Sequence, residues 1–71
     1  MTRPVHPVPD HVFRMADQTS RLVVGISRGQ VTYLVETDGR FNPGTEQTQG
    51  IQAFGKDMVA DLGPVDPEKV L

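Results

Sequence analysis

The sequence predicts a mainly β domain, folded as a small, strongly bent barrel with a central hairpin and a short helical turn near the C-terminus. The segment Arg21 to Glu36 is rich in β-branched and aromatic residues, and its only interruption is Ser27-Arg28-Gly29-Gln30. Three to five short apolar runs are separated by Gly-, Pro- and Asn-containing turns. A length of 71 residues suits a single domain. A three-stranded sheet packed by a short helix is the alternative architecture.

The composition excludes several kinds of site and predicts that the chain associates with copies of itself. The chain has no Cys, which excludes disulfides, thiolate zinc sites, iron–sulfur clusters and thiol nucleophiles. A domain this short buries only about 60% of its unfolded surface, and small domains commonly add a disulfide, a metal or a partner subunit. Without Cys, a homo-oligomer is the expected route to extra stability. The sequence has no transmembrane stretch and no apolar signal-peptide core, so a soluble, cytoplasmic protein is expected.

The hairpin has a predicted register. A two-residue loop, Arg28-Gly29, sets Ile26 opposite Val31, and counting outward places six apolar side chains on one face, which we assign to the core: Leu22, Val24, Ile26, Val31, Tyr33 and Val35. Val23 and Leu34 then lie opposite each other on the second face. Arg-Gly is a weaker type I′ sequence than Asn-Gly, so a three-residue loop or a bulge is the alternative.

The remaining elements follow from local pattern. His11 to Met15 alternates and predicts a first strand, and Thr37-Asp38-Gly39-Arg40 predicts a turn with Gly39 at positive φ. The polar segment Phe41 to Gly50 is expected to be an irregular, disordered loop. Gly50 to Phe54 is expected to form a strand and Gly55 to Leu62 a short helix. One helix from Ile51 to Leu62 is the alternative, disfavoured because Gly55 in its middle costs about 1 kcal/mol.

The expected organisation is a flexible Pro-rich arm (1–9), a barrel domain (10–64) and a tail (65–71), with neither end adding much stability.

Chemical motifs give no catalytic site. His6 and His11 lie near Asp10 and Asp17, but nothing in the pattern preorganises a metal site. The G-x-S-x-G match around Ser27 falls inside the predicted hairpin, where the strand-to-helix turn of a hydrolase cannot form. No phosphate-binding glycine motif is present. We therefore predict no catalytic residue and no metal ligand.

The sequence pattern favours a binding function. Val23 and Leu34 form an apolar pair on the outer face of the hairpin, a face that is normally polar in a monomer, and this favours a cover from the C-terminal turn or from another subunit. The alternative is a surface that binds nucleic acid, which fewer features of the sequence support. It would use scattered arginines with Tyr33 and Phe41 as stacking platforms, although the net charge is −2.

The order of elements resembles an SH3-like small barrel. Within that class, three segments resemble the plasmid-borne type B dihydrofolate reductases: Val23-Val24-Gly25, Tyr33-Leu34-Val35-Glu36-Thr37 and Ile51-Gln52-Ala53-Phe54. The resemblance spans roughly residues 10–62. In that family a Val-Gln-Ile-Tyr strand from each of four subunits lines a pore that holds folate and NADPH. Gln52 matches this strand, whereas Ala53 and Phe54 replace its Ile and Tyr, and the family's hairpin Trp is absent.

Two functions are therefore expected. The first is a small non-catalytic interaction module that self-associates and needs no cofactor, with another protein as the alternative partner. Its candidate binding residues are Val23, Leu34, Arg28, Gln52 and Phe54. The alternative, implied by the resemblance, is an oligomeric pore-type reductase that binds NADPH and dihydrofolate.

Overall fold

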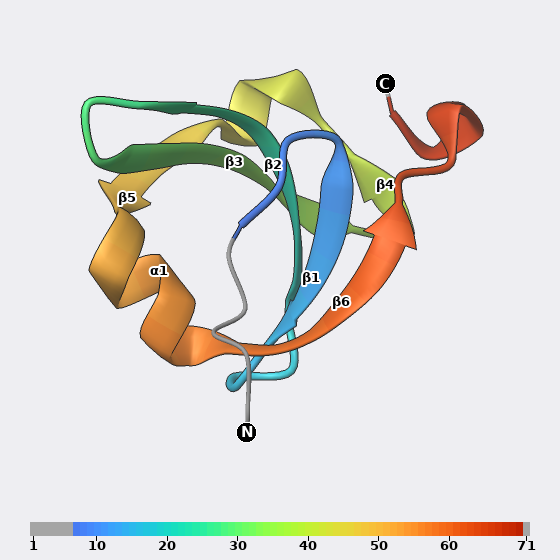
Figure 1. Cartoon of the computed structure of the whole chain (residues 1–71). Helices are drawn as coiled ribbons and strands as arrows, with labels where there is room; N and C mark the ends of the chain where they lie inside the picture. Colours follow the sequence, from blue (N-terminus) through green and yellow to red (C-terminus); the bar gives the residue numbers. More distant parts are fainter. Residues whose placement is uncertain (1–6, 71) are drawn as a thin grey trace.

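A computed structural model describes residues 7–70 and shows a mainly β fold with one short helix (Figure 1). There are also two short 3₁₀ turns: η1 (Pro43–Thr45) joins β4 to β5, and η2 (Pro67–Lys69) follows β6. The strands and helix are β1 (His11–Met15), β2 (Ser20–Ser27), β3 (Gln30–Thr37), β4 (Arg40–Phe41), β5 (Gln47–Gly50), α1 (Ile51–Asp57) and β6 (Met58–Pro64). The predicted first strand, His11 to Met15, is confirmed as β1.

The strands form one antiparallel arrangement in the order β4-β3-β2-β1-β6, and β5 pairs with the first half of β3. The sheet curls, but β5 and β6 do not pair with each other. Instead, α1 runs from the end of β5 to the start of β6 and covers the opening between them (Figure 1). The mainly β prediction is confirmed, whereas the sheet does not close into a barrel within residues 7–70.

The tip of the β2–β3 hairpin is as predicted. Arg28 and Gly29 form a two-residue loop with φ of 52° and 75°, the positive values that a type I′ turn requires at both positions. Ser27 pairs with Gln30 and Ile26 with Val31. The β3–β4 turn has the same backbone signature, since Asp38 and Gly39 have φ of 54° and 79°. Gly39 therefore adopts the predicted positive φ.

Beyond the tip, a β-bulge at Val24 corrects the predicted register. Gly25 pairs with Thr32, but the next pair is Val23 with Tyr33, so Val24 is the extra residue of β2. The shift moves Val23 into the core and leaves Val24 39% exposed. Ile26, near the hairpin tip and 37% exposed, is also not a core residue. The rest of the predicted core set is buried or partly buried: Leu22, Val31, Tyr33 and Val35.

The second half of the chain differs from the prediction in the order of its elements. Residues 51–57 are helical and 58–64 are extended, the reverse of the expected strand followed by helix. Ile51, Phe54 and Met58 pack on the same cluster at helical spacing, and this burial outweighs the low helix propensity of Gly55. The segment Phe41 to Gly50, expected to be disordered, contains β4, η1 and β5, and Phe41 is buried.

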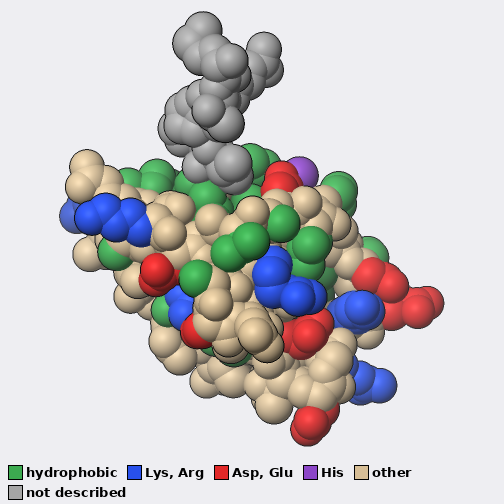
Figure 2. Space-filling view, turned by 90° about the horizontal axis from the view of Figure 1, so that it is seen from below, with side chains coloured by type: hydrophobic (Ala, Val, Ile, Leu, Met, Phe, Trp, Pro, Cys, Tyr) green, Lys and Arg blue, Asp and Glu red, His purple; other side chains and the backbone are tan. Residues whose placement is uncertain are grey.

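Several apolar side chains stay on the surface. Seen from below, they gather toward one side of the molecule, and charged side chains are scattered over the rest of that face (Figure 2). The two most exposed large apolar side chains of the described residues are both on β6, Val59 at 65% and Leu62 at 51%. β6 is an edge strand, so its outer side has no strand partner.

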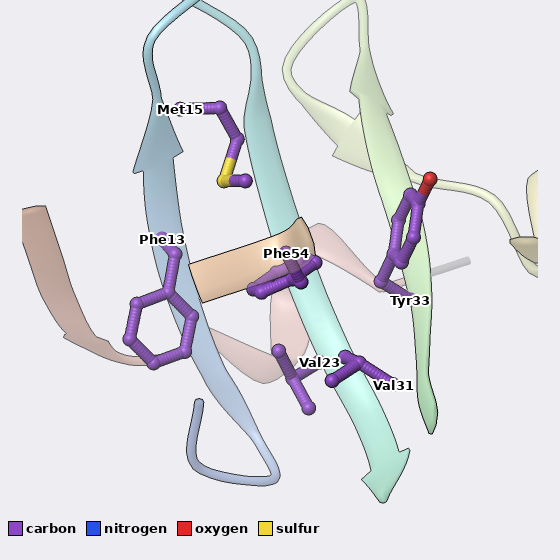
Figure 3. Close-up of a cluster of buried hydrophobic side chains, with 6 residues drawn as sticks. All are labelled: Phe13, Met15, Val23, Val31, Tyr33 and Phe54. Atoms are coloured by element: carbon purple, nitrogen blue, oxygen red, sulfur yellow. The ribbon is translucent and has the colours of Figure 1, made fainter. Parts of the chain in front are cut away.

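One face of the sheet carries the main core, with Phe54 of α1 at its centre (Figure 3). The Phe54 ring lies edge-on to Phe13, with centroids 6.2 Å apart, and tilted against Tyr33 at 5.4 Å. Such aromatic contacts add to the hydrophobic gain of burial. The helix is also tied by its ends, since the Ile51 N–H donates to the Gly29 carbonyl at 2.8 Å and the Asp57 carbonyl accepts from the Ala16 N–H at 2.7 Å. The buried members are Phe13, Met15, Val23, Val31, Tyr33 and Phe54.

The other face carries a smaller cluster of Leu22, Leu34 and Phe41, with Val12 and Val65 packed against it. Val65 comes from the segment expected to be a free tail. Its N–H donates to the Asp10 carbonyl at 2.8 Å, and Val70 forms a bridge with Phe41. Val65 and Val70 therefore tie both ends of residues 65–70 to the rest of the fold. Of the expected N-terminal arm, residues 1–6 lie outside the described residues, and so does Leu71 at the other end.

Candidate functional site

The five binding residues expected from the sequence do not form one site. Val23 and Phe54 are buried in the main core, and Leu34 is buried in the smaller cluster on the other face. Because of the bulge, Val23 and Leu34 are not opposite each other, and side chains of this same chain cover both. Arg28 lies in the exposed hairpin turn and Gln52 on the exposed side of α1.

The residues that a reductase pore or a nucleic-acid surface would use also lie elsewhere than the sequence predicts. Residues 51–54 form the first turn of α1 and not a strand, so they do not present a Gln-containing strand to a pore. Tyr33 and Phe41 are buried, and neither ring is free to stack on a base. In residues 7–70 no group of three or more His, Asp or Glu side chains is placed to hold a metal ion. No helix in this part of the chain is long and apolar enough to cross a membrane.

The candidate site is an open groove of about 360 Å³ over the smaller cluster. Its volume lies at the low end of the 300–1,000 Å³ typical of ligand pockets. The groove lies between the sheet and the C-terminal segment that crosses it, so β1, β2, β3, β4, β6 and η2 all contribute. The apolar lining residues are Val12, Phe41, Leu62, Pro64 and Val65, and the polar ones are Arg14, Ser20, Glu36, Asp66 and Lys69.

The sheet register explains why polar side chains line one side of this groove. Arg14 pairs with Ser20 across β1 and β2. Because Arg21 pairs with Val35, extending the register by one residue sets Ser20 opposite Glu36. Arg14, Ser20 and Glu36 thus form a row across three strands, with a cation and an anion on either side of a hydroxyl. Two residues along each strand, on the same face, lie Val12, Leu22 and Leu34.

The side chains of this polar row lack partners within the described residues. Ser20 as a whole residue is 8% exposed, and its hydroxyl makes no hydrogen bond to another residue of the described chain, but unlike Nε of Arg21 it is not a fully buried atom without a partner. The ion pairs between described residues are His11–Asp61 and Arg21–Asp17, so none involves the charged groups of the groove. Unpaired charges of both signs around an apolar floor are suited to binding a ligand with complementary charges.

Arg21 forms a second polar cluster, on the main-core face. Its guanidinium lies over the Tyr33 ring, 4.7 Å from the centroid, and Nη1 donates to Oε1 of Gln49 at 3.2 Å. The buried Nε has no hydrogen-bond partner in the described structure, and the nearest carboxylate oxygen, on Asp17, is 3.7 Å from Nη2. The guanidinium plane packed on an aromatic ring stabilises the edge of the core. We interpret this cluster as structural.

The third polar cluster joins the edge strand β6 to β1. His11 Nδ1 lies 3.1 Å from Oδ1 and 3.2 Å from Oδ2 of Asp61, and Asp61 also accepts the Gly63 N–H at 2.8 Å. The Gly63 N–H, followed by His11, holds the pKa of Asp61 below its ordinary value of 3.8. The hydroxyl and N–H of Thr19 likewise lower the pKa of Asp17. Both carboxylates are therefore stabilised by folding.

These lowered pKa values predict the pH dependence of stability. A carboxyl group with a depressed folded-state pKa contributes stability above its unfolded value, here 3.8, and loses it as the pH falls through the folded value. Because Asp61 is partly exposed, we expect Asp61→Asn to lower the unfolding free energy by no more than about 1 kcal/mol at pH 6. The difference from the unmodified protein should shrink as the pH falls below 3.8 and vanish once the carboxyl group is protonated in the folded state. Urea unfolding at several pH values measures it, and a difference that does not shrink on acidification would contradict the assignment.

The fold and the groove define a small, mainly β protein with an open groove lined by charges of both signs. Comparison of the chain with protein-family models, curated proteins and solved structures finds no match. The groove was not expected from the sequence. Its walls depend on the bulged register and on the packing of the C-terminal segment, neither of which a local pattern reveals. One signal was present in the sequence: on each of three neighbouring strands, a polar residue lies two positions from an apolar residue on the same face.

Proposed function

We propose that the protein is a small, non-catalytic interaction module that self-associates through the outer edge of β6. The observation that carries the proposal is that Val59 and Leu62, the most exposed large apolar side chains of the described chain, both lie on this edge strand. An unpaired strand edge with apolar side chains is a template for pairing with another chain. Val23 and Leu34, where the sequence predicts the contact, are buried, so we assign the contact to β6 instead.

A second copy is the partner that best fits this edge. An antiparallel contact between two β6 strands is isologous and closes after two subunits. Irregular pairing with β1 at Val59 and near Gly63, together with Pro64, limits the regular part of the edge to the middle of the strand, at Ala60 and Asp61. A short contact of this kind favours a reversible dimer over an open-ended fibre. It would add burial to a domain whose own core is small.

The non-catalytic part of the proposal rests on the same part of the chain. The His11–Asp61 pair is the one His–carboxylate contact in residues 7–70, and no hydroxyl group is hydrogen-bonded to its imidazole there. A nucleophile next to a base that is oriented by a third group is the usual signature of covalent catalysis. The pair instead links two strands.

Sedimentation velocity over a wide concentration range tests the association. We expect a monomer–dimer equilibrium for the unmodified chain, and Val59→Lys should weaken the dimer by at least about tenfold, because a charge replaces an apolar contact. Val24→Lys is the matched control, since Val24 is an exposed valine on β2. A monomer at every concentration would refute self-association. Equal weakening by both variants would exclude β6 as the contact, and circular dichroism checks that each variant is folded.

A further inference from the structure

We propose that the His11–Asp61 pair makes the self-association of this chain depend on pH, with the dimer tightening when His11 is protonated. This regulation rests on the proposed contact between two β6 strands. Asp61 lies in the regular middle of the β6 edge, and its carboxylate contacts a histidine on β1, the strand directly beside β6 (Figure 1).

Two-fold symmetry brings the two Asp61 side chains of a dimer together. In an antiparallel contact between identical strands, the residue at the symmetry axis lies opposite its own copy. With Asp61 at the axis, the two Asp61 Cβ atoms are about 4.5–5.5 Å apart, and with Ala60 at the axis they are diagonal neighbours about 7–8 Å apart. In both registers the two carboxylates lie on the same face of the joined sheet. Like charges placed in this way weaken the pairing of the strands.

His11 is positioned to offset this repulsion. Its Nδ1 lies 3.1 Å from Oδ1 and 3.2 Å from Oδ2 of Asp61, and both side chains are partly exposed, at 28% and 39%. A neutral imidazole can keep this hydrogen bond, but only the protonated ring also compensates the negative charge. Imidazole is the side chain that ordinarily changes charge between pH 5 and 8. Asp61 stays ionised in that range, because the Gly63 N–H and His11 lower its pKa.

The other charged groups near the pair do not replace His11. Within residues 7–70, Asp61 is the one carboxylate at ion-pair distance from His11. Arg21 of β2 is on the same face of the sheet, but its guanidinium packs on Tyr33 and donates to Gln49. The Asp57 carbonyl binds the Ala16 N–H, so the end of α1 lies at the far end of β1. The remaining charged residues on the elements around the pair are Asp10, next to His11 in sequence, Lys56 and Asp57 of α1, and Arg14, Asp66 and Lys69 along the groove.

Sedimentation velocity of the full chain at pH 5.5 and pH 7.5 in low salt tests the proposal. We expect the dimer Kd to be about threefold lower at pH 5.5, the size expected of one screened like-charge pair between strands. In 1 M NaCl, where the screening length is about 3 Å, the two Kd values should converge.

Three variants identify the groups responsible. Asp61→Asn removes the repelling charge, so its dimer should be as tight at pH 7.5 as at pH 5.5. His11→Gln removes the titrating group, so at both pH values its Kd should match that of the unmodified chain at pH 7.5. His6→Gln is the matched control, because His6 is the only other histidine of the chain, and it should retain the full response. Circular dichroism checks that each variant is folded.

The outcomes separate this inference from self-association itself. A dimer with the same Kd at both pH values, or a tighter dimer at pH 7.5, would refute the pH dependence and leave the β6 contact standing. A monomer under every condition would refute both. A response that persists in Asp61→Asn, or one that is lost in His6→Gln and kept in His11→Gln, would show that other groups are responsible.

Discussion

Replacing Phe54 with Ala is expected to abolish cooperative folding. Phe54 is fully buried and contacts rings on both sides, Phe13 and Tyr33. Removing a buried Phe side chain typically destabilises a protein by about 3–5 kcal/mol. Total stability at 71 residues is on the order of 5 kcal/mol, so the substitution removes most of it. Urea unfolding followed by circular dichroism should show a broad, non-cooperative signal in place of a sigmoidal transition.

The control for this prediction is Gln52→Ala, a substitution on the exposed side of the same helix. Ala has a slightly higher helix propensity than Gln, so we expect the unfolding free energy to change by less than about 0.5 kcal/mol. If Phe54→Ala retains a sharp transition close to that of Gln52→Ala, α1 is not packed on the main core. The sheet would then need another cover for its concave face.

The central role of Phe54 shows what the local sequence pattern could and could not predict. β1 and the Arg28-Gly29 turn depend on residues close together in the chain, and both were predicted correctly. A helix starting at Ile51 was only the alternative, because Gly55 lowers intrinsic helix propensity. The packing of Phe54 on a sheet formed from residues 11–37 outweighs that penalty, and such a contact cannot be read from a local window.

The candidate groove was harder to predict for a related reason. Its polar row becomes visible only when Arg14, Ser20 and Glu36 are aligned across three strands, and the alignment of β2 with β3 requires the bulge at Val24. A regular register, as expected from the alternation of residues 21–36, sets Arg21 opposite Glu36 and so hides the row. The far wall of the groove comes from η2, in a charged segment whose composition resembles that of a loose tail.

The bulge itself gives the second large prediction, a comparison of Val23→Ala with Val24→Ala. The two valines are adjacent and chemically identical, but Val23 is fully buried beside Val31 and Phe54, whereas Val24 is the 39% exposed extra residue. We expect Val23→Ala to lower the unfolding free energy by about 2 kcal/mol, because two buried methyl groups are lost and a cavity is left. Val24→Ala should change it by no more than about 0.5 kcal/mol.

Thermal unfolding distinguishes the two registers directly. In a domain of this size 1 kcal/mol shifts the melting temperature by about 4–8 °C, so Val23→Ala should melt roughly 8–16 °C lower and Val24→Ala within a few degrees of the unmodified protein. A regular hairpin would reverse the order, since it points Val24 into the core opposite Tyr33. The reversed result would also mean that Arg14, Ser20 and Glu36 do not form a row, because Ser20 would no longer lie opposite Glu36. The same pair of substitutions therefore tests the register on which the groove depends.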